Sequence, residues 1–163
     1  MNILLFPNPV LREKSEKIKD ITQKTAGLAA SLEKLLSANK GCVGIAAPQT
    51  GKLQRLVVVD VTGHKKAEQQ SGQLILINPE VLIAQGASEN REGCLSVPDF
   101  TGNVKRADGL RIKYIDIDSN ERLLETSGFE AVVIQHEIDH LDGVLFIDRI
   151  KNSRRDLFKR KNY

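Results

Sequence analysis

Apolar residues recur at helical spacing between Thr25 and Lys40, so the sequence predicts an amphipathic helix near the N-terminus. Gly41 follows where a C-terminal cap belongs, because glycine readily adopts the left-handed conformation that ends many helices. The apolar positions of this helix are Leu28, Leu32, Leu35 and Leu36.

A second helix is predicted to start at Ser127-Gly128-Phe129-Glu130, which fits the capping box of Ser, two spacers and Glu. It would run to about Leu141, and Gly143 would stop it.

Between these helices, runs rich in β-branched and aromatic residues predict several strands. The predicted strands are Arg55–Val61, Leu74–Ile77, Arg111–Ile117 and a short one at Leu123 and Leu124. Asn78-Pro79 is expected to close the second of them, and the polar segment Thr62–Gly72 is expected to be a loop. This order predicts an α+β fold, a single domain over residues 1–163 with antiparallel or mixed strands around the second helix.

Composition supports one globular domain, with 163 residues of which 40% are hydrophobic and 28% charged. No stretch approaches the ~20 apolar residues that a membrane span needs. The N-terminus lacks the basic start and the cleavage site of a secretory signal, so we expect a cytoplasmic protein without a membrane partner. Two cysteines, Cys42 and Cys94, are too few for a disulfide framework.

The second predicted helix carries His136-Glu137-Ile138-Asp139-His140, the HExxH pattern of metal-dependent hydrolases. Residues four apart lie on one face of a helix, so His136 and His140 can reach one metal ion. Glu137 can act as general base toward a water molecule. The pattern can also arise by chance on a surface or core helix, but the capping signal and the apolar residues before it supply the expected context.

A catalytic metal site of this kind needs a third protein ligand and one open position. Two common protease arrangements are excluded, because no Glu follows Glu137 and Phe146 stands where the pattern HExxHxxGxxH has its last His. The remaining candidates are His64, Cys42, Cys94 and a few downstream aspartates. We interpret His64, in a polar loop beside lysines, as a solvated residue, whereas a Cys94 thiolate would bind a metal strongly.

Three segments resemble the peptide deformylase family in order and spacing. They are Gly44-Ile45-Ala46-Ala47-Pro48-Gln49, Glu92-Gly93-Cys94-Leu95-Ser96 and Gln135-His136-Glu137-Ile138-Asp139-His140. The opening Phe6–Leu11 and the ending Leu145–Arg149 also look like that family, so the resemblance covers nearly the whole chain.

The resemblance implies an enzyme that removes the formyl group from N-formyl-methionyl nascent peptides and releases formate. It implies that Cys94, His136 and His140 hold one divalent metal ion, usually Fe²⁺, which Zn²⁺, Ni²⁺ or Co²⁺ can replace. Glu137 would then be the acid/base residue.

The resemblance also implies roles outside the metal ligands. The side-chain amide of Gln49 and the backbone N–H of Leu95 would stabilise the oxyanion, and the main chain of Gly44 would bind the substrate backbone. The chain departs from the family at Cys42, which stands where a glycine is usual and places a second thiol near the site.

Apolar residues ahead of His136 suggest where the substrate side chain binds. Phe129, Val132 and Val133, with Val43 opposite, are expected to line a pocket for an unbranched side chain. Methionine suits such a pocket because it is flexible and polarizable.

Two other readings of the site are a zinc endopeptidase of the HExxH type and an inactive peptide-binding relative. The basic C-terminal tail suggests a contact with the ribosome, although a short basic run is more often a solvated helix face and gives no reason to expect specific nucleic-acid binding. Its basic residues are Arg149, Lys151, Arg154, Arg155, Lys159, Arg160 and Lys161.

Overall fold

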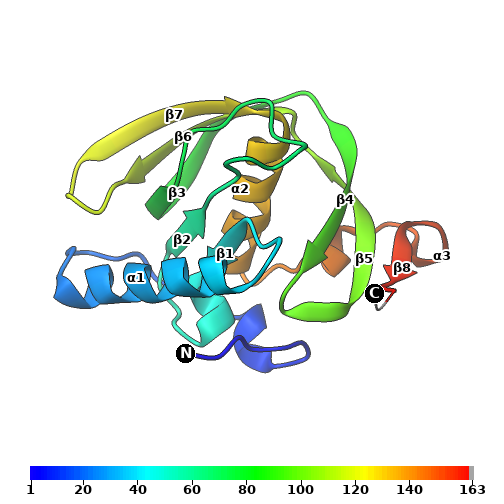
Figure 1. Cartoon of the computed structure of the whole chain (residues 1–163), viewed down its shortest axis with the longest axis horizontal. Coiled ribbons are helices and arrows are strands. Elements are labelled where there is room, and N and C mark those ends of the chain that lie inside the picture. The colour runs from blue at the N-terminus through cyan, green and yellow to red at the C-terminus, as the bar shows by residue number, and fades with distance from the viewer. Residues whose placement is uncertain (162–163) are drawn as a thin grey trace.

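Two antiparallel sheets flank helix α2 (Gly128–Leu141) in the computed structural model of the chain, which describes residues 1–161 (Figure 1). The larger sheet has the strand order β1-β2-β3-β6-β7, and the smaller has the order β4-β5-β8. Neighbouring strands in both sheets are antiparallel. The α+β fold with antiparallel strands expected from the sequence is therefore confirmed.

The elements have the following bounds. The larger sheet consists of β1 (Gly44–Ala46), β2 (Leu56–Val59), β3 (Leu74–Gln85), β6 (Gly109–Ile115) and β7 (Glu121–Ser127). The smaller sheet consists of β4 (Ser88–Cys94), β5 (Val97–Arg106) and β8 (Leu157–Lys159). The other helices are α1 (Gln23–Ala38) and α3 (Ser153–Asp156), and 3₁₀ turns cover Pro9–Arg12, Ala47–Thr50 and Phe146–Arg149. No helix of residues 1–161 is long and apolar enough to cross a bilayer.

Strand β2 is buried on both faces because a helix packs on each side of it. Val57 and Val59 share one core cluster with Ile134 of α2. Leu56 and Val58 point the other way, into a second cluster with residues of α1 such as Leu32. This double burial explains why the strand is a continuous apolar run rather than an alternating one.

Strand β3 continues past Asn78-Pro79, so the prediction that it closes there was wrong. Its pairing with β6 shifts register between Ile77 and Glu80, and the irregularity accommodates a proline that has no N–H to donate. Asn78 adopts φ 50°, and its side chain makes two hydrogen bonds to the backbone of Ile18. Its amide oxygen accepts from the Ile18 N–H at 2.9 Å, and its amide nitrogen donates to the Ile18 carbonyl at 2.8 Å.

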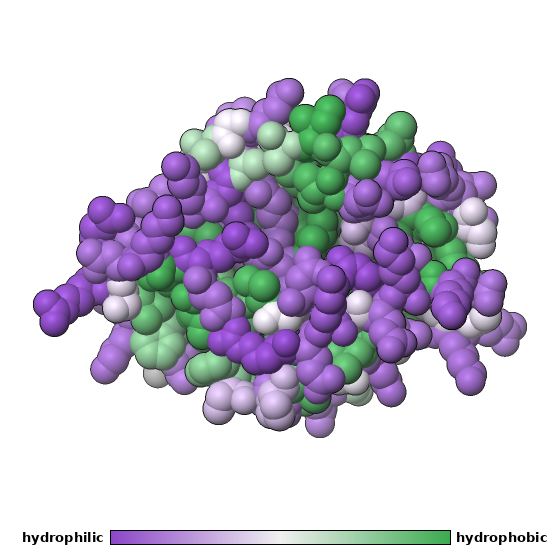
Figure 2. Space-filling model, turned by 180° about the vertical axis from the view of Figure 1, so that it is seen from behind, coloured by the Kyte–Doolittle hydropathy of each residue, from purple (hydrophilic) through white to green (hydrophobic). Residues whose placement is uncertain are grey.

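The far part of β3 is not covered by a helix. Val81, Leu82 and Ile83 are 39% to 44% exposed there. Figure 2 shows the side of the molecule opposite to Figure 1, where hydrophobic side chains gather near the top of an otherwise mostly hydrophilic surface.

Helix α2 begins where the sequence suggested, but the predicted capping box does not form. Ser127 makes no side-chain capping bond. Glu130 is fully buried and accepts hydrogen bonds from the Thr126 hydroxyl at 2.7 Å and from Ser71 at 2.6 and 2.7 Å. The Glu130 carboxylate therefore binds the loop before β3 to the helix. It is not used to cap the first turn of the helix.

Candidate metal centre

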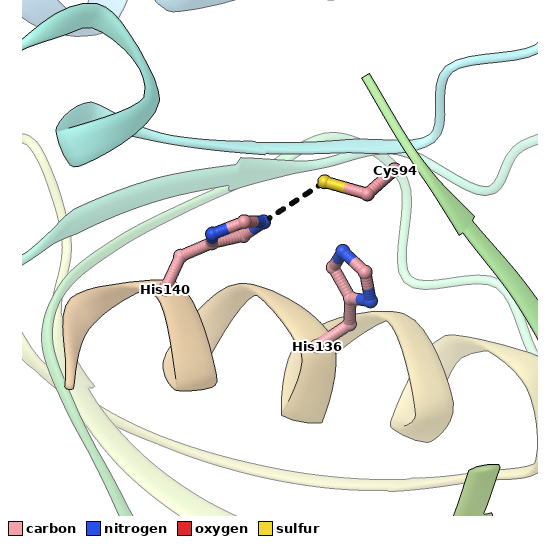
Figure 3. A group of neighbouring side chains, drawn as sticks. All are labelled: Cys94, His136 and His140. Carbon is pink, nitrogen blue, oxygen red and sulfur yellow. Dashed lines mark hydrogen bonds between the residues drawn. The ribbon is translucent and has the colours of Figure 1, made fainter. Parts of the chain in front are cut away.

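The side chains of Cys94, His136 and His140 converge in the interior (Figure 3). One ligand atom from each lies within 4.8 Å of those of the other two, and the Cys94 sulfur is 3.3 Å from Nε2 of His140. The histidines project from successive turns of α2, and the cysteine is the last residue of β4. All three are buried. The geometry brings the motif histidines together with Cys94 and leaves His64 and Cys42 out of the group.

The turn between β4 and β5 fixes the position of the thiol. Cys94 pairs with Val97 across this turn, after a register shift at Gly93. The carbonyl of Ser96 accepts a hydrogen bond from the N–H of Phe6 at 2.8 Å, which ties the turn to the N-terminal segment. Cys94 also packs in a core cluster with Phe146, so its backbone has little freedom.

The neighbouring charges favour a thiolate. Burial opposes a negative sulfur, yet the two imidazoles hold the pKa of Cys94 well below that of an ordinary thiol. Burial likewise opposes a charged imidazole, but the thiolate and the Glu92 carboxylate raise the pKa of His136 well above its usual range. A group of one thiolate and two imidazoles is a suitable ligand set for a divalent transition metal.

Glu92 orients His136. Its Oε1 lies 2.8 Å from Nδ1 of the imidazole, which leaves Nε2 to face the thiol. Although burial alone would raise it, the pKa of Glu92 is lowered to about 2 because Arg106 and His136 stabilise the carboxylate. A carboxylate behind a ligating histidine fixes both the tautomer and the ring orientation.

A buried charge network continues from Glu92. Arg106 donates two hydrogen bonds of 2.8 Å to Glu92 and one of 2.6 Å to Asp139. Asp139 in turn accepts from Arg149 at 2.5 and 2.7 Å. Glu92 and Asp139 belong to two of the segments that resemble the family, but the sequence indicated no role for either of them, and no local pattern marks Arg106.

Glu137 lies beside the ligand group and against the backbone of β1. A Cβ added at Gly44 would lie 2.5 Å from its Oε1, so only glycine leaves room for the carboxylate. Burial raises the pKa of Glu137 to about 7. Its Oε2 is buried and has no hydrogen-bond partner among residues 1–161, and the same is true of Nδ1 of His140. An unpartnered buried carboxylate oxygen next to three ligand atoms fits a site that binds a metal ion and a reacting molecule.

The side-chain amide of Gln49 lies near the thiol. The amide nitrogen of Gln49 is 3.5 Å from the Cys94 sulfur and 3.1 Å from the Ser96 hydroxyl, and its carbonyl accepts from Ala46 N–H at 2.9 Å. Leu95 occupies the β4–β5 turn and lines the cavity. Gln49 is thereby held rigidly with its N–H₂ toward the site.

A cavity of about 690 Å³ opens onto the ligand group. Its wall includes Val43, Phe129, Val132 and Val133, as well as Gly44. His64, expected to be solvated, is only partly exposed and stacks on Phe129 with ring centroids 4.3 Å apart. It therefore forms part of the cavity wall, a position that the polar loop sequence did not reveal.

Cys42 also lines the cavity but is separate from the ligand group. Its thiol donates to the carbonyl of Gly44 at 3.2 Å. Burial, with a contribution from Glu137, raises its pKa to about 12, so it stays a neutral thiol.

Comparison with known proteins identifies the family. The sequence profile described as Polypeptide deformylase matches residues 1–156. The chain belongs to this family. As a member of it, the chain is an enzyme, a peptide deformylase, and the alternative of a zinc endopeptidase finds no support in these matches.

Relatives in sequence and structure agree with this assignment. The chain is 40% identical over 162 residues to a peptide deformylase from Thermodesulfovibrio yellowstonii, covering 99% of the chain and 95% of the relative. It is 39% identical over 160 residues to one from Helicobacter hepaticus, with 98% and 88% coverage. A crystal structure of a peptide deformylase from Legionella pneumophila matches with a TM-score of 0.85 and 33% identity, over 94% of this chain and 88% of that one.

Proposed function

We propose that the enzyme hydrolyses the N-formyl group of the N-terminal formyl-methionine of newly made polypeptides and releases formate. The observation that carries this proposal is the buried Glu137 beside Cys94, His136 and His140 in a cavity with a patch of apolar residues in its wall. A peptide N-terminus with its first side chain fits a cavity of about 690 Å³ that ends at these groups.

Cys94, His136 and His140 would hold the metal, which we propose to be ferrous iron, with zinc, nickel or cobalt able to replace it. When bound, the ion supplies Lewis acidity that makes hydroxide available at neutral pH and polarises the formyl carbonyl. The soft thiolate and the two imidazoles are compatible with each of these metals.

Glu137 would move the proton. With a pKa near 7 it can accept a proton from the attacking water as the C–O bond to the formyl carbon forms. It then returns that proton to the leaving amine nitrogen as the C–N bond breaks, so the products are formate and a free α-amino group. Oε2 of Glu137 has no hydrogen-bond partner among residues 1–161, so it is available to accept and return this proton.

Gln49 and Leu95 would stabilise the oxyanion. The Gln49 amide is fixed by Ala46 and Ser96 and directs its N–H₂ toward the Cys94 sulfur. The backbone N–H of Leu95 lies in the turn directly after the metal-ligating cysteine. Donors placed before the reaction need no reorganisation, and removing one of them typically slows turnover about 10²–10³-fold.

The first side chain of the substrate would lie against Phe129, Val132 and Val133, with Val43 opposite. These residues line one continuous cavity with the catalytic groups. Gly44 belongs to β1, an edge strand of the larger sheet, so its main chain is able to pair with an extended substrate backbone.

A contact with the ribosome through the basic tail is a further part of this proposal. Arg149 and Arg155 are already paired with Asp139 and Asp156. Lys151, Arg154 and Lys159 are exposed and suit a phosphate surface. The tail cannot be deleted cleanly, because β8 pairs with β5.

Charge substitution is therefore the sharper test of ribosome binding. The triple change of Lys151, Arg154 and Lys159 to Gln should reduce co-sedimentation with ribosomes at low salt, and high salt should reduce that of the unaltered enzyme. Equal sedimentation of the two proteins at low salt would remove the tail from the proposal.

The activity itself is tested by anaerobic purification, metal analysis and a formate-release assay on a formyl-methionyl peptide. One metal ion per chain with formate release supports the proposal. Metal binding without formate release would favour an inactive peptide-binding relative, and cleavage of internal peptide bonds would favour an endopeptidase.

A further inference from the structure

The mouth of the cavity is strongly basic. Its basic lining residues are Lys40, Lys65, Lys66, Arg91 and Arg160. Three acidic residues also line the cavity, but two of them are engaged deeper inside. Glu92 is bonded to Arg106 and His136, and Glu137 lies buried at the metal ligands. Among the lining residues this leaves Glu89 as the single carboxylate at the mouth.

Arg160 comes from the C-terminal segment yet lies against the strand that carries Cys94. A Cβ added at Gly93 would be 2.4 Å from its Nη2, so the guanidinium packs on the bare backbone of that glycine. The N–H of Arg160 donates to the carbonyl of Asp99 at 2.8 Å, which anchors the segment after β8. The side chain is therefore placed one residue away from a metal ligand.

The guanidinium of Arg160 is available to a ligand. It is exposed and forms no ion pair or side-chain hydrogen bond with the other residues of 1–161. The other arginine of the mouth, Arg91, stacks over Phe158 at 3.7 Å and donates to Asn103 at 2.9 Å. Lys66 lies over the ring of Phe129, 6.0 Å from its centroid. Arg160 is thus the arginine at the mouth whose planar donors have no protein partner in the described part of the chain.

We propose that Arg160 is a specificity-determining residue that favours an acidic side chain at the second or third residue of the formylated substrate. This inference rests on the proposed function, which places the formyl group at Cys94 and the first side chain in the apolar wall. An extended peptide advances about 3.3 Å per residue, so the next two residues pass the mouth. A carboxylate there can pair with the guanidinium in a two-bond arrangement. The lysines around the mouth add attraction for the same charge.

The test uses two pairs of formyl-methionyl tripeptides. The members of the first pair differ only in having Glu or Gln at the second residue, and those of the second pair differ in the same way at the third residue. All are C-terminal amides, so that no terminal carboxylate competes for the guanidinium. We expect kcat/KM to be about three- to tenfold higher for the Glu peptide at one of these positions, and mainly through KM. Salt on the order of 0.5 M should reduce this ratio toward one.

Arg160→Gln removes the charge and should bring the Glu-to-Gln ratio close to one. Lys34→Gln is the matched control, because Lys34 is an exposed residue of α1 that does not line the cavity, and it should keep the ratio. A ratio near one in the unaltered enzyme, or an undiminished ratio in Arg160→Gln, would overturn the inference. Equal turnover of all peptides defeats only this role of Arg160, whereas release of formate from none of them defeats the proposed function.

Discussion

Glu92 contacts both a proposed metal ligand, His136, and the buried charge network of the fold. Its carboxylate makes a hydrogen bond to Nδ1 of His136 and accepts two hydrogen bonds from Arg106. Arg106 also donates to Asp139 of α2. Buried charges are tolerated when every member of the network has a partner, and losing one partner leaves a charge uncompensated. The orientation of the ligand and the packing of β4 on α2 therefore depend on the same carboxylate.

Glu92→Gln should weaken metal binding about 10–100-fold, the usual effect of removing the group behind a ligating histidine. It should also lower the free energy of unfolding, because Arg106 loses the full charge of its partner. Metal titration and denaturant unfolding measure the two effects. Glu121→Gln, at an exposed position of β7, is the control and should change neither. Unaltered metal affinity in Glu92→Gln would refute the orienting role.

At the scale of elements, the sequence predicted those whose patterns are local. The leucine spacing marked α1, and the apolar run before the motif marked α2. Strands β4 and β5 were missed because β4 consists mostly of polar and charged residues, Ser88–Glu92, which show no apolar strand pattern although β4 pairs with β5 across the adjacent turn. The path of β3 through Asn78-Pro79 depends instead on a distant contact, the two hydrogen bonds between Asn78 and Ile18.

The residues of the candidate site also fall into those that local sequence patterns predict and those that only the fold brings together. His136, Glu137 and His140 share one helix, so their spacing alone predicted that they could meet at a metal. Cys94 was one of several open candidates until the resemblance selected it, because nothing local shows which strand faces α2. Arg106 and Arg160 could not be predicted, since each reaches the site from a different strand or segment.

Apolar residues near the N-terminus of α2 line the cavity, so we expect a change there to alter which substrates the enzyme prefers. Val132 is buried and lines the cavity ahead of His136. Val132→Asp should raise KM for formyl-methionyl peptides far more than for formyl-glycyl peptides, because only the former place an apolar side chain there. Steady-state kinetics on both peptides measure this, with circular dichroism to show that the variant folds. An equal rise for both would place the side-chain pocket elsewhere.

At the scale of the whole molecule, segments from both ends of the sequence help to build the site. Phe6 fixes the turn after Cys94, and the segment after β8 brings Arg160 over Gly93. The sequence suggested that the basic tail contacts the ribosome or forms a solvated face, and this stays a prediction. The structure adds that β8 of the tail completes the smaller sheet and that Asp156 is buried. The site thus depends on residues from both sheets and from α2, and no single element contains it.

The metal proposal predicts a property of the intact enzyme. With ferrous iron held by a thiolate, activity should decay in air, because O₂ can oxidise the iron from its working ferrous state and can oxidise the Cys94 sulfur, which removes one ligand. The nickel-loaded enzyme should survive longer under the same conditions. Formate release measured over hours in air for both forms is the assay. Equal air stability of the iron and nickel forms would count against iron as the working metal.

Formate release by Glu137→Gln, with the metal content measured in the same preparation, tests the proposed chemistry of the site most directly. We expect this variant to keep the metal, because Cys94, His136 and His140 are intact, but to lose about 10²–10⁴-fold in turnover. His136→Ala should instead lose metal and activity together. Near-normal formate release by metal-loaded Glu137→Gln would contradict the role given to the buried carboxylate, and with it the proposed chemistry of the site.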